Sequence, residues 1–148
     1  MKKTGIILSL LLLTACVARA QDYKAALGIR FSSKAALINN SVSLKYFFSP
    51  AVAAEALFSF GDPLALGILV EKHKPFPGDH FKFFYGGGAY AGFAGPRRGG
   101  LQGVLGLDYK ISSFPFNLSL DWKPELTFTR EFSFEPAALG LSARFTLK

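Results

Sequence analysis

One stretch of the chain alternates without interruption between apolar and polar side chains. In residues 116–128 (FNLSLDWKPELTF) every even position is apolar and every odd position is polar or charged. Successive side chains of an extended strand point to opposite faces, so this stretch predicts a strand with one apolar and one polar face. Its 13 residues, at about 3.3 Å each, are long for an ordinary strand and suit a tilted strand that crosses a hydrocarbon layer.

The same alternation recurs along the rest of the chain, and no segment has a convincing helical pattern. An even number of strands, joined by alternating short and longer connections, predicts an all-β fold: an eight-stranded antiparallel up-and-down barrel. Closure removes the strand edges that such apolar segments would otherwise expose. The predicted strands span residues 23–31, 41–47, 52–60, 64–71, 81–93, 101–111, 116–128 and 139–147.

The polar face of these strands determines which side of the barrel is the inside. An eight-stranded barrel is just wide enough for side chains to fill it, so an ion-paired interior is plausible. The apolar face is too large for a water-facing surface, and its aromatic residues gather near strand ends, as interface girdles do. We therefore predict a transmembrane barrel whose lumen is filled by a structural polar network. Its predicted members are Lys24, Arg30, Lys45, Glu55, Glu71, Lys82, Asp108, Lys110, Asp121, Lys123, Glu125 and Arg144.

The bulk composition is consistent with one exported domain. The chain has 148 residues, of which 18% are charged and 50% hydrophobic, which places it below the usual charged fraction of about a quarter. Its formal charge is +7, but without Lys2, Lys3 and Arg19 it has 14 basic and 10 acidic residues. That excess is too small and scattered to indicate nucleic-acid binding.

Residues 1–20 have the features of a secretory signal peptide. Two lysines precede an apolar run, and Ala18-Arg19-Ala20 forms a small-x-small cleavage site. A second interpretation is a lipobox at residues 13–16, which would make Cys16 a lipidated N-terminus. Cys16 is the sole cysteine, so the predicted mature domain, residues 21–148, has no disulfide or thiolate metal site. Export places the barrel in the outer membrane of a bacterial cell.

The predicted topology follows from placing both termini in the periplasm. The connections at residues 49–50, 73–80 and 112–115 then face the periplasm. Those at residues 32–40, 61–63, 94–100 and 129–136 face outside. The outer connections are short, which argues against a large adhesive crown.

Few residues indicate chemistry beyond the lumen. The two histidines, His73 and His80, fall in a predicted periplasmic loop rich in proline, and we interpret them as ordinary loop residues. Arg97 and Arg98 lie between glycines in an outer loop, where they could bind lipopolysaccharide phosphates. Paired lumen carboxylates could serve acid–base catalysis, but no substrate cleft is indicated. We predict no catalytic residue, no cofactor and no metal site.

Four segments resemble a known family, the small outer-membrane β-barrel proteins of Bacteroidota, similar in architecture to OmpX and the OmpA membrane domain. The segments are VSLKYF (42–47), FYGGG (84–88), GVLGLDYK (103–110) and FNLSLDWKP (116–124). The resemblance implies a membrane barrel inserted by the outer-membrane assembly machinery, and it implies no shared reaction. One departure is the C-terminus, where such barrels usually end in an aromatic residue and this chain ends FTLK.

Together these features predict a non-enzymatic, porin-like outer-membrane protein with a structural or surface-interaction role. Its expected partners are outer-membrane lipid, lipopolysaccharide and the assembly machinery, and we expect a monomer. Two alternatives stay open. The first is a soluble exported lipocalin-like barrel that binds an apolar ligand, and the second is a lipid A-modifying barrel enzyme.

Overall fold

The structure is a computed structural model that describes residues 23–34, 38–61, 64–76, 80–93, 98–128 and 132–148. The predicted signal peptide and cleavage site lie outside these residues. All regular structure in the described part of the chain is β-strand, and none of it is a helix long and apolar enough to cross a membrane. The strands are β1 (Ala25–Ser32), β2 (Ser41–Ser49), β3 (Val52–Ser59), β4 (Ala65–Pro75), β5 (Phe81–Gly92), β6 (Gly99–Lys110), β7 (Phe116–Trp122), β8 (Glu125–Phe128), β9 (Phe132–Glu135) and β10 (Leu139–Leu147).

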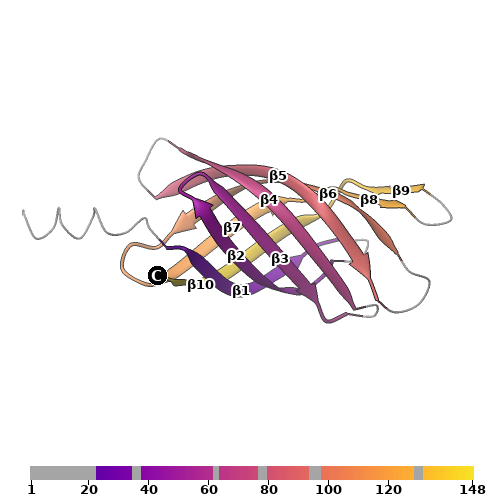
Figure 1. Ribbon diagram of the computed structural model, residues 1–148, viewed down its shortest axis with the longest axis horizontal. Helices are drawn as coiled ribbons and strands as arrows, with labels where there is room; N and C mark the ends of the chain where they lie inside the picture. The colour runs from indigo at the N-terminus through magenta and orange to yellow at the C-terminus, as the bar shows by residue number, and fades with distance from the viewer. Residues whose placement is uncertain (1–22, 35–37, 62–63, 77–79, 94–97, 129–131) are drawn as a thin grey trace, which may run out of the picture.

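The strands form one closed antiparallel barrel (Figure 1). The order around the wall is β5-β4-β3-β2-β1-β10-β7-β6, and pairing of β5 with β6 closes the ring. β7 and β8 are successive segments that both pair with β6. β9 and β10 are likewise successive segments of one strand, and β9 pairs with β8. Counting each of these as one interrupted strand leaves eight, which confirms the predicted eight-stranded barrel.

The interruption between β7 and β8 falls at Lys123 and Pro124. A proline has no N–H and cannot donate to a sheet ladder. The backbone groups at this interruption are nevertheless hydrogen-bonded. The Pro124 carbonyl accepts from the Gly103 N–H at 3.0 Å, and the Lys123 N–H donates to the Ala138 carbonyl at 2.8 Å. The predicted strand 116–128 therefore follows one path, with a local irregularity at the proline.

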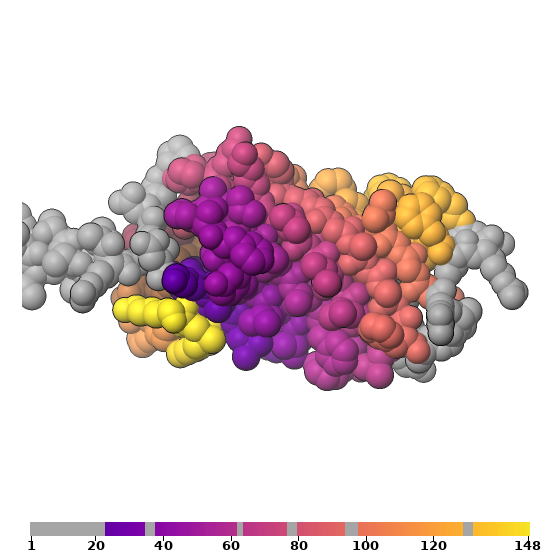
Figure 2. Space-filling model, viewed as in Figure 1, coloured from indigo at the N-terminus to yellow at the C-terminus, as the bar shows by residue number. Residues whose placement is uncertain are grey.

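Burial alternates along each strand and confirms that the polar face is the inside. In β7 the side chains of Asn117, Ser119 and Asp121 are buried, whereas Leu120 between them is 58% exposed. β10 has the same pattern, with Arg144 buried and Leu141 56% exposed. On the face seen in Figure 2, the outward side chains form a continuous wall.

The interior also contains an apolar cluster that the alternation did not predict. It lies among inward positions of β3 to β6 and includes Ile38, which belongs to the connection between β1 and β2. Ile38 is fully buried and lies against Gly67 of β4. The cluster consists of Ile38, Leu57, Ala65, Leu69, Phe84, Tyr90 and Val104. The lumen is therefore filled by both charged and apolar side chains.

The two largest departures from the predicted loops are segments of strand. β4 continues to Pro75 and pairs with β5 as far as Lys82, so the expectation that residues 73–80 form a loop is wrong for His73. Residues 132–135, predicted as loop, form β9. They pair in register with β8, from Glu125 opposite Glu135 to Phe128 opposite Phe132. In Figure 1 this hairpin lies at the end of the barrel away from the C-terminus.

Candidate functional site

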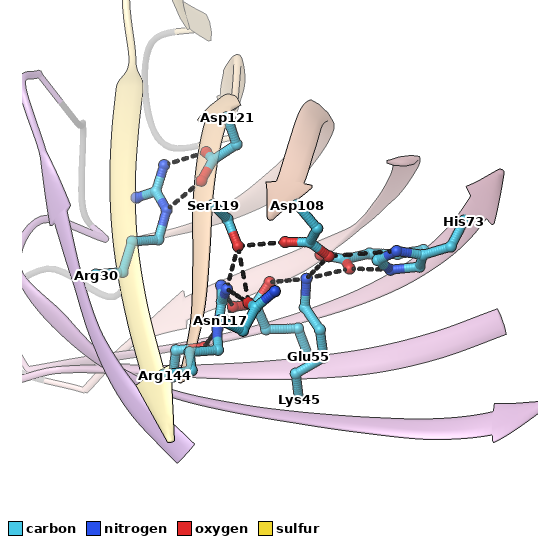
Figure 3. Close-up of polar contacts among 11 residues, drawn as sticks. Arg30, Lys45, Glu55, His73, Asp108, Asn117, Ser119, Asp121 and Arg144 are labelled. Carbon is cyan, nitrogen blue, oxygen red and sulfur yellow. Dashed lines mark hydrogen bonds and ion pairs between the residues drawn. The ribbon is translucent and has the colours of Figure 1, made fainter. Parts of the chain in front are cut away.

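The most distinctive chemistry of the described chain is a group of charged side chains inside the barrel (Figure 3). These side chains come from inward positions of several strands, because every second side chain of a strand faces the lumen. We call Lys45, Glu55, Glu71, His73, Asp108 and Arg144 the central cluster. All six are at most 3% exposed.

Arg144 on β10 joins four strands. Its Nε donates to the Ser43 hydroxyl at 2.6 Å, and its Nη1 donates to the Asn117 side-chain oxygen at 3.3 Å and to the Ser119 hydroxyl at 2.5 Å. Its Nη2 donates to Glu55 and forms an ion pair with it. The planar guanidinium suits this role because its donors point in fixed, separate directions.

Lys45 on β2 is the second cation of the central cluster. Its Nζ lies 2.8 Å from Glu71 Oε2, 3.5 Å from Asp108 Oδ2 and 3.8 Å from Glu55 Oε2. The same ammonium lies 4.4 Å from the centroid of the Phe84 ring, which adds a cation–π contact. One point charge thus contacts carboxylates from three other strands.

His73 on β4 lies between two carboxylates. Its Nε2 is 3.0 Å from Glu71 Oε2, and its Nδ1 is 3.3 Å from Asp108 Oδ2. The ring stacks on Phe84, with centroids 5.2 Å apart, and also contacts Phe47 at 4.8 Å. The sequence contained a signal for this placement, since His73 continues the inward parity of Glu71.

Two smaller polar groups lie apart from the central cluster. Arg30 donates to both carboxylate oxygens of Asp121, at 3.1 and 2.5 Å, and Figure 3 shows this pair beside the cluster. Lys123 Nζ donates to Glu125 at 2.8 Å and to the Gln102 side-chain oxygen at 3.0 Å. Each group pairs one cation with one carboxylate, as burial of charges requires.

Three of the predicted network residues lie elsewhere. Lys24 is exposed before β1. Lys82 is half-buried at the start of β5, with its Nζ 6.0 Å from the Phe47 ring centroid. Lys110, at the end of β6, donates to the main-chain carbonyls of Ile111 and Phe114, both at 2.8 Å. These lysines share the inward parity of the network, but they lie near strand ends, where the lumen opens.

The remaining predicted residues are at the connections. Arg97 lies outside the described residues. The Arg98 carbonyl accepts from the Gly92 N–H at 2.6 Å, which joins the ends of β5 and β6. His80 precedes β5, and the Ser112 hydroxyl lies 2.9 Å from its Nδ1. His80 is therefore part of the connections near the termini, as predicted.

Cavities lie at the two ends of the barrel. One of about 310 Å³ is lined by residues around the β1–β2 connection, including Arg30, Asn40 and Phe60. The other, about 590 Å³, is lined by residues near the C-terminus, including Tyr23 and Phe47. Burial raises the pKa of the Tyr23 phenol, and the charge of Asp108 adds to this effect. Tyr23 is therefore a neutral hydrogen-bonding group at neutral pH.

The central cluster is built for charge balance and strand-to-strand connection. Its side chains are buried and joined by ion pairs, while His73 Nδ1 and Asp108 Oδ2 have no hydrogen-bond partner among the described residues. Within the described ranges no group of His, Cys, Asp and Glu side chains has the arrangement of a metal site. Chemically, the cluster can keep charged groups and bound protons out of contact with water.

Comparisons with protein-family models, characterised proteins and solved structures found no match. The class of protein that the coordinates establish is a closed eight-stranded antiparallel barrel with buried polar and charged side chains inside. The resemblance to the outer-membrane family of Bacteroidota stays a prediction.

Proposed function

We propose that this chain is a non-enzymatic barrel of the bacterial outer membrane with a structural or surface-interaction role. The observation that carries the proposal is the reversed distribution of polarity. Ten acidic, basic or histidine side chains of the described residues are buried inside, while large apolar side chains cover the outside. A soluble barrel requires the opposite arrangement, because water solvates charges and disfavours contiguous apolar surface.

The outward apolar surface extends around the whole barrel. It includes Ile29 on β1, Leu44 on β2, Phe58 on β3 and Ile68 on β4, and it continues through β5, β6, β7 and β10. Neighbouring strands place these side chains beside one another: Leu120 is opposite Leu107 on one side and Leu141 on the other. Lipid acyl chains are the solvent that such a surface fits.

Aromatic side chains support the same proposal because they gather near both ends of the strands. At the end near the termini, Phe116 packs on Phe145 with centroids 5.7 Å apart, and Tyr46 packs on Phe48 at 5.2 Å. At the other end, Phe58 packs on Phe60 at 4.6 Å. Outward aromatic residues at two heights are typical of the girdles at membrane interfaces.

The soluble lipocalin-like alternative finds less support. It requires an apolar cavity inside and charged side chains outside, whereas the interior observed here holds the central cluster. The partners we propose are therefore outer-membrane lipid, the assembly machinery and, through Arg97 and Arg98, lipopolysaccharide phosphates. A monomer satisfies these contacts, since closure of the barrel leaves no long strand edge in the wall.

Cysteine labelling tests the proposal. The protein is produced without residues 1–20, so Leu120→Cys or Ser112→Cys introduces a single thiol for an environment-sensitive fluorophore. After refolding into vesicles, we expect lipid-borne quenchers to quench the dye at position 120 strongly and the dye at position 112 weakly, since Ser112 lies in a turn. A folded protein that stays in solution, with neither dye quenched, would overturn the proposal. Outer-membrane fractionation and a gel band that shifts on boiling provide the cellular test.

A further inference from the structure

The three groups of charges inside the barrel differ in their balance. Among the described residues, Arg30 with Asp121 and Lys123 with Glu125 each pair one cation with one carboxylate. The central cluster contains two cations, Lys45 and Arg144, but three carboxylates, Glu55, Glu71 and Asp108. The excess carboxylate therefore lies in the one group that also contains a histidine.

The contacts of His73 require an additional proton in the same group of side chains, the central cluster. A neutral imidazole has one N–H donor and one nitrogen lone pair. Here both ring nitrogens face carboxylate oxygens, at 3.0 Å (Glu71) and 3.3 Å (Asp108). With a neutral ring and two ionised carboxylates, a lone pair would face a negative oxygen. One further proton, on the ring or on a carboxylate, makes the Glu71 contact a hydrogen bond and removes the repulsion at the Asp108 contact, whose two atoms have no hydrogen-bond partner among the described residues.

We propose that Glu71, His73 and Asp108 form a buried binding site for one proton, which the folded barrel retains at neutral and mildly alkaline pH. Geometry and charge count lead to the same number: one proton removes the repulsion between His73 and a carboxylate, and it neutralises the excess carboxylate. The site is closed to water, because the three side chains are at most 3% exposed. Its existence does not depend on whether the barrel lies in a membrane.

Charged groups from every neighbouring strand act on this site. Those nearest are the two cluster cations, whose charges Glu55 partly offsets, and Lys82 faces the site from the end of the lumen. The groups are Lys45 on β2, Glu55 on β3, Lys82 on β5 and Arg144 on β10, together with Glu71 on β4 and Asp108 on β6, which belong to the site. The Tyr23 phenol, before β1, also faces Asp108.

The proton links folding to pH. In the unfolded chain above about pH 7, both carboxylates are ionised and the histidine is neutral, so the three groups hold almost no proton. Folding then takes up one proton, and stability is lost as pH rises. The unfolding equilibrium constant should rise tenfold per pH unit, from about pH 7 up to the pH at which the folded site releases its proton.

Glu71→Gln tests this proposal. The variant removes the excess carboxylate, and the Gln amide can donate to His73 while the ring donates to Asp108, so no further proton is needed. Urea unfolding in detergent micelles, followed by the fluorescence of the single tryptophan, is measured at half-unit steps from pH 7 to 9. Asp121→Asn is the matched control: it neutralises the carboxylate of the buried Arg30–Asp121 pair, and because arginine side chains keep their charge in proteins it adds no new titrating group and leaves the proposed site unchanged.

We expect the unfolding constant of the wild type, divided by that of Glu71→Gln, to rise about tenfold over one pH unit. Asp121→Asn should be less stable at every pH and keep the wild-type slope. Equal pH slopes for the wild type and Glu71→Gln would overturn the proposal. If Glu71→Gln does not refold, Asp108→Asn removes the other carboxylate of the site. The pH slopes of the wild type and Asp108→Asn are then compared in the same way, and equal slopes overturn the proposal.

Discussion

Arg144 is the interior side chain whose loss we expect to destabilise the barrel most. Arg144→Met keeps a long, unbranched side chain but removes the donors to Ser43, Asn117, Ser119 and Glu55. The central cluster is then left with one cation for three carboxylates.

The structure sets the magnitude of this effect. Removing one partner of a buried ion pair costs about 3–5 kcal/mol, because the remaining charge is left uncompensated in a low dielectric. Glu55 keeps contacts with the Ser43 hydroxyl at 2.5 Å and the Lys45 ammonium at 3.8 Å, and it also lies against the Glu71 carboxyl. Arg144→Met should therefore reach this range, whereas Glu55→Gln, which leaves two cations and two carboxylates, should cost clearly less.

A double-mutant cycle measures the coupling between the two residues. The free energy of unfolding is determined from urea titrations in micelles for the wild type, both single variants and Arg144→Met/Glu55→Gln. We expect the double variant to be more stable than the sum of the single effects by about 0.5–3 kcal/mol, the range for residues in direct contact. A cost below about 1 kcal/mol for Arg144→Met, as for an exposed ion pair, would refute the view that the interior depends on this residue.

Three further predictions concern the filled lumen. Ile38→Ala should lower the free energy of unfolding by about 2–5 kcal/mol, measured by urea titration, because the Ile38 side chain is fully buried in the apolar cluster; Leu120→Ala, on the outer face, is its control. Gly140→Ala should cost about 1–3 kcal/mol, because a Cβ there would lie 2.1 Å from Arg30 Nη2, and pairing with Arg30→Met should reduce that cost. Planar-bilayer recordings of the wild type should show no steady conductance, and a persistent ohmic pore would contradict a lumen closed by side chains.

The sequence predicted most of the architecture because alternation is a local property. A strand shows its two faces in consecutive residues, so the pattern of residues 116–128 identified an amphipathic strand before any partner was known. Repetition of the pattern, with the small number of ways to close such strands, led to the eight-stranded barrel. The same reasoning assigned Arg30, Asp121 and the charged members of the central cluster to the inward face.

The errors occur where strands end or irregular segments fold back. Proline-rich composition suggested a loop around His73, but pairing with β5 extends β4 to Pro75. Ile38 fills the lumen from a connection, and no periodic pattern marks such a residue. Lys24 and Lys110 have inward parity, but Lys24 precedes β1 and Lys110 is the last residue of β6, since parity determines the face and not the height along the axis.

Taken by itself, the sequence determined that the chain forms amphipathic strands and which side chains share a face, because a period of two depends only on backbone geometry. Only the tertiary structure decided which charges meet. Lys45 contacts Glu71 and Asp108, which belong to strands that are not its neighbours in the wall. Contacts across a lumen depend on the tilt and stagger of all strands together. They exist only once the barrel has closed.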